Sequence, residues 1–245
     1  MTIYRARPGQ VAYGYAIGML CAEWHIPFIP GDLNNAGTFP FPVRYLTVPG
    51  VAGSGVLDGS GEGFAEALGE AAKQLEAEGV RAITGNCGFM AAYQEYVAEQ
   101  VQVPVFLSSL LQAPMLTSML GKSQTLGIVT ANSKGMTPNL LSAAGIEDES
   151  RVVVQGLEDY EHFNDVILKE LGDLDETRMR ADVVAASLEM VDREPSVGAI
   201  LLECSDLPAY SKAVHEATGL PVFDWASYIT YVYNAVVPRR YDGIF

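Results

Sequence analysis

One segment of this 245-residue chain occurs twice, at an offset of 117 residues (204 minus 87). When residues 82–106 are aligned with residues 199–223, ten of the 25 positions are identical. A shorter similarity relates residues 17–20 to residues 126–129. A period this long is not that of a solenoid, and it predicts two similar lobes within one chain. The identical residues of the first copy are Ala82, Ile83, Cys87, Ala92, Tyr93, Val97, Glu99, Pro104, Val105 and Phe106.

Each copy places a cysteine just after a predicted buried strand. Residues 197–202 are continuously apolar, which is typical of a strand covered on both faces, and Cys204 follows them. Pro208 indicates a helix start soon after the thiol, with Ser205 or Asp206 as its cap. Open α/β sheets bind ligands at this position, and the helix dipole there favours thiolate over thiol.

Strand and helix patterns alternate along the chain. Such alternation predicts an α/β fold of two pseudosymmetric Rossmann-like lobes with mainly parallel sheets and an active site in the cleft between them. We expect residues 1–110 and 225–245 to form the N-terminal lobe and residues 111–224 the C-terminal lobe. Strands are predicted at 12–21, 43–48, 80–84, 103–107, 126–130, 152–155 and 197–202. Helices are predicted at 61–79, 89–101, 110–121, 137–144, 160–171, 175–192 and 226–236.

The composition argues against several classes of function. A formal net charge of −15 disfavours binding to nucleic acid or to an anionic membrane. No apolar run is long enough to span a bilayer, and residues 11–22 lack a secretory cleavage pattern, so we expect a cytoplasmic protein. The sequence has no P-loop, no dinucleotide-binding glycine motif and no cluster of metal ligands. We therefore expect a small-molecule substrate, with no metal and no cofactor.

Two thiols that face each other across a cleft suit proton transfer at carbon. A thiolate at Cys87 or Cys204 can remove a proton from a substrate carbon. The opposite thiol then returns a proton on the other face, or a leaving group departs. Cys21 has no counterpart in the repeat, and we expect it to be a small buried apolar residue. Three cysteines in a chain of this length do not form a disulfide scaffold.

Residues beside the two cysteines are candidate substrate ligands. Backbone N–H groups at Gly88 and Ser205, at the predicted helix starts, can hold a carboxylate. Asn86 and Glu203 directly precede the thiols and are candidates to tune them, with a structural hydrogen bond as the alternative for Glu203.

Further candidates come from other strand ends and from the loop after the first strand. The segment 24–42 is rich in proline, glycine and aromatic residues and follows the first strand, where α/β folds keep ligands. Within it, Asp32 is a candidate site residue, with a turn role as the alternative. Tyr15, Trp24 and Phe39 are candidates for an aromatic wall, with core packing as the alternative. Hydroxyl and amide candidates, each with helix capping as the alternative, are Ser108, Ser109, Thr130, Asn132 and Ser133.

With both cysteines located, the chain resembles the aspartate/glutamate racemase superfamily over nearly its whole length. The segment Cys204-Ser-Asp-Leu-Pro208 is similar to the second cysteine motif of glutamate racemases, Cys-Thr-His-x-Pro, with Asp206 in place of histidine. The resemblance is closer to the algal dimethylsulfoniopropionate (DMSP) lyase branch, although that branch has Asp where this chain has Asn86. The resembling segments are Pro30-Gly-Asp32, Ile83-Thr-Gly-Asn-Cys-Gly-Phe-Met90, Val105-Phe-Leu-Ser-Ser-Leu110, Thr130-Ala-Asn132 and Ala199-Ile-Leu-Leu-Glu-Cys-Ser-Asp-Leu-Pro-Ala-Tyr-Ser211.

The resemblance implies cofactor-free deprotonation alpha to a substrate carboxylate, in a homo-oligomer (dimer or tetramer). The leading hypothesis is β-elimination of DMSP to dimethyl sulfide and acrylate, with Cys204 as base and Cys87 as the opposing thiol. The alternatives are racemisation of an aspartate/glutamate-type or hydantoin-type acid, and an inactive binding protein on the same scaffold. An aromatic subsite poor in anions would favour a sulfonium substrate, and an acidic or amide-lined subsite an ammonium.

Overall fold

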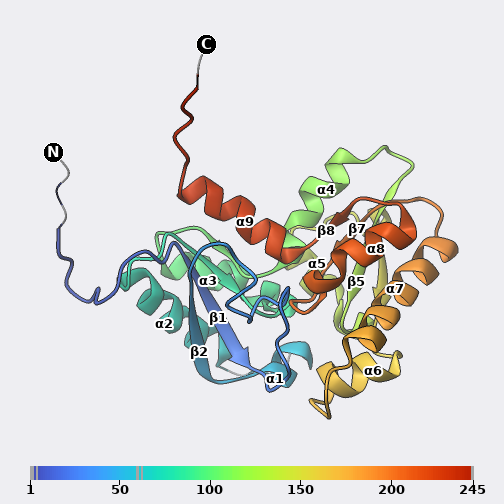
Figure 1. The fold of residues 1–245 in the computed structure, drawn as a ribbon, viewed down its shortest axis with the longest axis horizontal. Helices are drawn as coiled ribbons and strands as arrows, with labels where there is room; N and C mark the ends of the chain where they lie inside the picture. Colours follow the sequence, from blue (N-terminus) through green and yellow to red (C-terminus); the bar gives the residue numbers. More distant parts are fainter. Residues whose placement is uncertain (1–2, 4, 59–60, 62, 244–245) are drawn as a thin grey trace.

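The computed structural model describes residues 3, 5–58, 61 and 63–243 of the chain. Two four-stranded sheets divide this part of the chain into two lobes (Figure 1). Every strand pairing is parallel, which confirms the predicted α/β class. The first sheet has the order β2-β1-β3-β4, with β1 Ile17–Glu23, β2 Val43–Ala52, β3 Ala82–Gly85 and β4 Val105–Phe106. The second has the order β6-β5-β7-β8, with β5 Thr125–Thr130, β6 Val152–Gly156, β7 Val197–Leu202 and β8 Val222–Phe223.

The duplicated sequence corresponds to a duplicated strand register. In the first sheet Ile17 of β1 pairs with Ala82 of β3, and in the second Leu126 of β5 pairs with Ala199 of β7. These four residues are the equivalent positions of the two sequence repeats. The cysteines of the repeat therefore follow the same strand of each sheet, and the predicted pseudosymmetry is confirmed.

Helices and short 3₁₀ turns connect the strands. Caps account for several starts: Thr137 Oγ1 accepts the Leu140 N–H, and Asp175 caps α7 through the Thr177 and Arg178 N–H groups. The α-helices are α1 Gly53–Asp58, α2 Phe64–Ala77, α3 Gln94–Gln100, α4 Ala113–Met119, α5 Pro138–Ala143, α6 Glu161–Phe163, α7 Glu176–Arg193, α8 Ser211–Thr218 and α9 Trp225–Val236. The 3₁₀ turns are η1 Gly88–Tyr93, η2 Ser109–Gln112, η3 Ser133–Gly135, η4 Glu149–Arg151 and η6 Leu207–Tyr210, and η5 Asn164–Leu168 is a π-helical turn.

Several elements differ from the sequence expectation, among them the first strand and the helices after the two cysteines. The first strand begins at Ile17 rather than at residue 12, because β2 and β3 pair with β1 only from Ile17 onward and Val11 is exposed. The helices after the two cysteines begin as the 3₁₀ turns η1 and η6 and become α-helical at Gln94 and Ser211. Each thiol is consequently followed by a short, tight turn rather than by a long helix.

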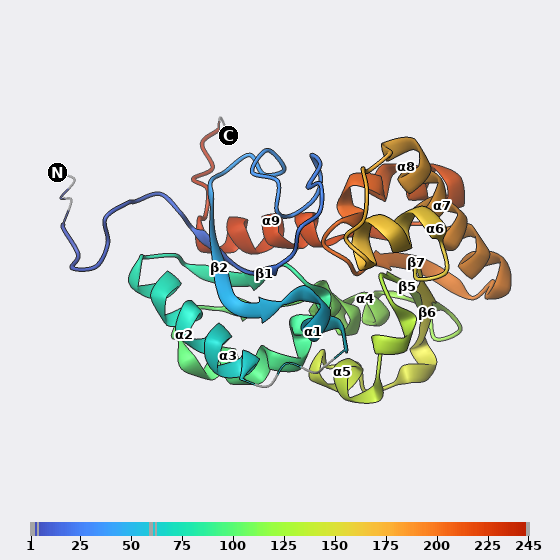
Figure 2. The same ribbon diagram turned by 90° about the horizontal axis from the view of Figure 1, so that it is seen from below.

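The last helix returns to the first lobe. Trp225 and Ile229 of α9 are fully buried in one apolar cluster with Ile17 and Met19 of β1. The Trp225 indole donates a hydrogen bond to Thr84 of β3 at 3.2 Å, and α9 lies on the opposite side of the first sheet from α2 and α3 (Figure 2). Within the described residues, no helix combines the length and apolar character that crossing a membrane requires.

Candidate active site

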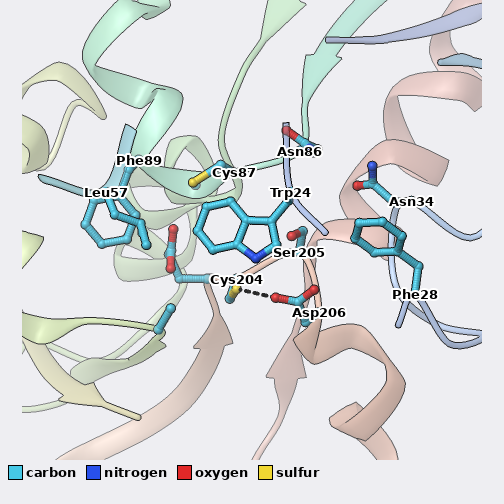
Figure 3. Close-up of a pocket in the computed structure, with 13 residues that line it drawn as sticks. Trp24, Phe28, Asn34, Leu57, Asn86, Cys87, Phe89, Cys204, Ser205 and Asp206 are labelled. Atoms are coloured by element: carbon cyan, nitrogen blue, oxygen red, sulfur yellow. Dashed lines mark hydrogen bonds between the residues drawn. The ribbon is translucent and has the colours of Figure 1, made fainter. Parts of the chain in front are cut away.

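Both repeated cysteines line one pocket between the lobes, where β3 and β7 end (Figure 3). Cys87 has extended backbone dihedrals and directly precedes η1, whereas Cys204 lies between β7 and η6. The pocket is lined by Trp24, Phe28, Asn34, Leu57, Asn86, Cys87, Gly88, Phe89, Ala131, Glu203, Cys204, Ser205 and Asp206. The strand ends of the two halves thus bring both thiols to a shared pocket, as the open α/β architecture requires.

Burial holds both thiols in their neutral form. It raises the pKa of Cys87, as does the negative charge of Glu203, and the N–H groups of Phe89 and Met90 offset only part of this. Burial and the nearby carboxyl of Asp206 likewise raise the pKa of Cys204, whose Sγ donates to Asp206 Oδ2 at 3.0 Å. The expectation of thiolates stabilised by a helix start is wrong for this pocket, because desolvation and neighbouring carboxylates outweigh the backbone dipoles.

The indole of Trp24 occupies the centre of the pocket, between the two thiols in Figure 3. Its Nε1 donates to the carbonyl of Ile167, in the π-helical turn of the other lobe, at 3.1 Å. Gly53 leaves room for the ring, since a Cβ there would lie 1.4 Å from its Cε3. The remaining free volume is about 20 Å³, whereas a single water needs about 10–15 Å³. A substrate the size of a small amino acid therefore needs more space than this form of the pocket offers, and the indole is the side chain at its centre.

Replacing Trp24 by alanine is expected to speed the alkylation of Cys87 and Cys204 by iodoacetamide. If the open form is about 10% populated or less, removal of the ring raises the rate at least about tenfold. Peptide mass spectrometry of each thiol over time gives both rates. Tyr15→Ala, which removes an aromatic ring outside the pocket, is the matched control. Equal rates in the wild-type protein and Trp24→Ala would show that the indole does not restrict access.

Thr130 and Ser109 contact Glu203 rather than the pocket. Thr130 Oγ1 donates to Glu203 Oε2 at 2.8 Å, and Ser109 Oγ donates to the Glu203 carbonyl at 2.7 Å. Both residues are fully buried, and neither lines the pocket. They hold the segment that carries Cys204.

Four other candidate residues lie away from the pocket. Ser108 caps η2 through the Leu110 N–H at 3.1 Å, and Asn132 caps η3 through the Lys134 N–H at 3.1 Å. Ser133 bonds the carboxylate of Glu158. Tyr15 is 36% exposed and lines a groove beside the N-terminal segment. The capping alternative fits Ser108 and Asn132, because strand-end position alone does not direct a side chain inward.

Asn86, Gly88 and Ser205 do line the pocket, and Asp32 lies just behind it. The Asn86 side chain accepts the Ala22 N–H at 2.9 Å, which fixes the amide beside Cys87. Asp32 is 2% exposed and lines a neighbouring cavity together with Asp206. Burial and the interaction with Asp206 raise the pKa of Asp32. Asp32 therefore contacts Asp206, which lines the pocket, and does not line the pocket itself.

Several residues that line the pocket could not be predicted from the sequence. Phe28 and Asn34 come from the loop of residues 24–42, in which the sequence indicates only Trp24, Asp32 and Phe39 as individual candidates. The sequence predicts Asp206 as a helix cap and as the replacement of a motif histidine, not as a site residue, yet its carboxylate accepts a hydrogen bond from the Cys204 thiol. Leu57, Phe89 and Ala131 carry no chemical signal that distinguishes them from core residues. By contrast, Phe39 is a core residue.

The pocket is aromatic and acidic at the same time. Trp24, Phe28 and Phe89 supply rings, whereas Glu203 and Asp206 supply carboxyl groups. None of the described lining residues is Lys, Arg or His. Because the pocket is both aromatic and acidic, its lining does not distinguish a sulfonium substrate from an ammonium substrate. The carboxyl groups, with no Lys, Arg or His among the described lining residues, favour a substrate that carries a positive charge.

The chain resembles both protein sequences and solved structures. A family model described as Asp/Glu/Hydantoin racemase matches residues 42–229. "Dimethylsulfoniopropionate lyase 5" of Emiliania huxleyi (strain CCMP1516) is 33% identical over 242 residues, which cover 94% of this chain and 47% of that protein. "Dimethylsulfoniopropionate lyase" of Durusdinium sp. clade D is 32% identical over 219 residues, which cover 85% of this chain and 71% of that protein. This chain therefore spans about half the length of the first relative.

A solved structure shares the two-lobed fold. Allantoin racemase from Pseudomonas fluorescens superposes with a TM-score of 0.61 at 19% sequence identity, covering 94% of this chain and 99% of that one. At this identity the similarity establishes the fold, and the chemistry has to be argued from the pocket.

Proposed function

Because this chain belongs to the Asp/Glu/Hydantoin racemase family, we propose that it removes the proton alpha to a substrate carboxylate without a cofactor. We propose further that the substrate is DMSP, which the enzyme cleaves to dimethyl sulfide and acrylate. The observation that carries the proposal is a single pocket lined by both repeated thiols, by aromatic rings and by carboxyl groups. The similarity to two DMSP lyases supports the choice of substrate.

In the proposed reaction Cys204 is the base and Cys87 the opposing thiol. The Cys204 thiolate takes the α proton and leaves the C–H electron pair as an α carbanion, and this pair then forms the new bond between the α and β carbons. The bond from the β carbon to sulfur breaks, and dimethyl sulfide departs with the electron pair of that C–S bond. The Cys204 thiol then loses its proton through Asp206, the carboxylate to which it donates.

The charge of the pocket supports a cationic substrate over a dicarboxylate. In the empty pocket, Asp206 and Glu203 raise the pKa of Cys204 and so disfavour the thiolate. A sulfonium bound against the Asp206 carboxylate and the aromatic rings offsets the charge of Asp206 and lowers the thiol pKa. Aspartate or glutamate would add a further negative charge instead. DMSP therefore helps to generate the base that attacks it.

The alternative is racemisation of an amino acid or a hydantoin-type acid. The presence of two thiols at equivalent strand ends favours it, since a racemase needs an acid on one face and a base on the other. Both reactions pass through the same carbanion, and they differ in whether the β carbon carries a leaving group.

Incubation in deuterated water with DMSP and a panel of amino acids separates the two reactions. The proposal predicts acrylate release from DMSP, detected by NMR, and no deuterium at the α carbon of the amino acids. Deuterium exchange in an amino acid without acrylate release would assign racemisation. An absence of both would contradict the proposal and favour a binding protein.

We further propose a homo-oligomer (dimer or tetramer) that resides in the cytoplasm, with lobes bounded at residues 110 and 225. Met115 and Met119 of α4 and Tyr231 of α9 are exposed, as the surface of a self-associating protein would present them. All three cysteines are free, which suits a reducing compartment. Light scattering in solution is expected to give a mass two or four times that of the chain, and a monomer mass would contradict the proposal.

A further inference from the structure

Glu203 combines complete burial with one carboxyl oxygen that has no partner. The residue follows β7, directly precedes Cys204, has no exposed surface and lines the pocket. Its Oε2 accepts a hydrogen bond from Thr130 Oγ1 at 2.8 Å, and the carboxyl also accepts the Ala131 N–H. Its Oε1 has no hydrogen-bond partner among the described residues. Buried polar atoms are rarely left in this state, and a ligand is one explanation for the exception.

The unpartnered oxygen lies between the two cysteine segments. A Cβ at Gly88, the residue after Cys87, would lie 1.5 Å from Glu203 Oε1. Glycine at this position therefore leaves the space that Oε1 occupies. Glu203 adjoins Cys204 along the chain and the residue after Cys87 through space, so Oε1 lies beside the position of a substrate held between the thiols.

The surroundings of Glu203 favour the protonated carboxyl. Burial and the charge of Asp206 raise the pKa of Glu203 to about 7, against the opposing hydrogen bonds from Thr130 and Ala131. The other titratable groups that line the pocket are Cys87 and Cys204. None of the described lining residues is a cation that would pair with an ionised Glu203. Because Oε2 accepts the hydrogen bond of Thr130 Oγ1, the proton resides on Oε1 and needs an acceptor.

We propose that protonated Glu203 donates a hydrogen bond from Oε1 to the carboxylate of the substrate. The inference depends on the proposed function only in that the substrate is a carboxylate. When the α proton is removed, negative charge develops on this carboxylate, and a buried donor aimed at it stabilises the transition state. A carboxylic acid kept neutral by an apolar site can perform this task. Glu203 is in this account a catalytic residue, and Thr130 is a positioning residue that acts through it.

The pH dependence of acrylate binding, measured by calorimetry, tests the proposal without requiring turnover. The wild-type affinity is expected to be constant below pH 7 and to fall about tenfold per pH unit above it, because binding requires the protonated carboxyl. Proton uptake on binding above pH 7, obtained by comparing buffers of different ionisation enthalpy, is expected to accompany this fall. Thr130→Val removes a hydrogen bond that lowers the Glu203 pKa, so the fall is expected to begin at higher pH.

Two substitutions distinguish hydrogen-bond donation from simple charge repulsion. Glu203→Gln presents its NH₂ at the position of Oε1, since its oxygen accepts from Thr130 at the position of Oε2, and it is expected to bind acrylate independently of pH. Glu203→Leu removes the donor and is expected to bind about tenfold to a hundredfold more weakly than Glu203→Gln. Equal affinities of the two variants, or no acrylate binding by the wild-type protein, would overturn the inference. If acrylate binding depends on pH as expected but the enzyme shows no lyase activity, the Glu203 inference stands. Only the proposal that DMSP is the substrate would then be contradicted.

Discussion

Replacement of Cys204 by alanine is expected to abolish acrylate release from DMSP, with a loss of about a thousandfold or more in kcat. The expectation follows because the thiol is the proposed base for the α proton, and a positioned base contributes about 10²–10⁴-fold. Cys204 lies in a pocket without histidine or lysine among the described lining residues, so no basic amine replaces it. Acrylate is quantified by chromatography, and circular dichroism verifies that the variant is folded.

Two further cysteine variants show whether the loss of activity is specific to Cys204 and whether the enzyme is a lyase or a racemase. Cys21→Ala removes the thiol that lies in the core of the first lobe and is expected to keep activity within about twofold. Cys87→Ala is expected to reduce elimination less than Cys204→Ala, because only one base is needed when a leaving group departs. A racemase would instead lose its activity in both Cys87→Ala and Cys204→Ala. Full activity of Cys204→Ala would assign the base to another residue.

Gly31→Ala is expected to lower the free energy of unfolding by about 3 kcal/mol or more. Gly31 has φ +104°, a conformation that costs an L residue about 1–3 kcal/mol. A Cβ at this position would also lie 2.6 Å from the Cα of Ala209, so backbone has to move. The turn that contains Gly31 packs against the segment after Cys204, and nearby the Leu33 N–H donates to the Ser205 carbonyl at 3.2 Å. Urea denaturation measures the loss.

Gly219→Ala separates the backbone conformation from the steric clash. Gly219 has φ +70° at the end of α8, and a Cβ there would meet nothing within 4 Å. Its substitution is therefore expected to cost about 1 kcal/mol. A loss in Gly31→Ala no greater than that in Gly219→Ala would show that the contact between Gly31 and Ala209 is not tight.

Much of the fold could be predicted from the sequence because the repeat constrains it. The apolar run of residues 197–202 matches β7 without error, and the offset between Cys87 and Cys204 matches the equivalence of β3 and β7. The predicted first strand begins too early because the apolar character of residues 12–16 does not reveal whether a neighbouring strand pairs with them. Strand pairing is a tertiary property that local sequence does not encode.

The site was predictable only where the chemistry was unusual. Two cysteines at equivalent strand ends predicted a shared pocket, and the structure places both there. The positions of Trp24 and Asn34 depend on how a 19-residue loop (residues 24–42) folds across the cleft, which no periodicity specifies. Ser133 sits at an equivalent strand end, yet Glu158 draws its side chain away from the pocket. The raised thiol pKa also follows from burial, which a motif does not show.

A crystal structure with 3-(trimethylammonio)propionate, an onium carboxylate with a poor leaving group, tests the central claim most directly. The account predicts that Trp24 has left the centre of the pocket, and that the α carbon lies about 3.5 Å from the sulfur of Cys204, with Cys87 on its opposite face. Binding of the ligand outside this pocket, or with its α carbon remote from both sulfurs, would contradict the account.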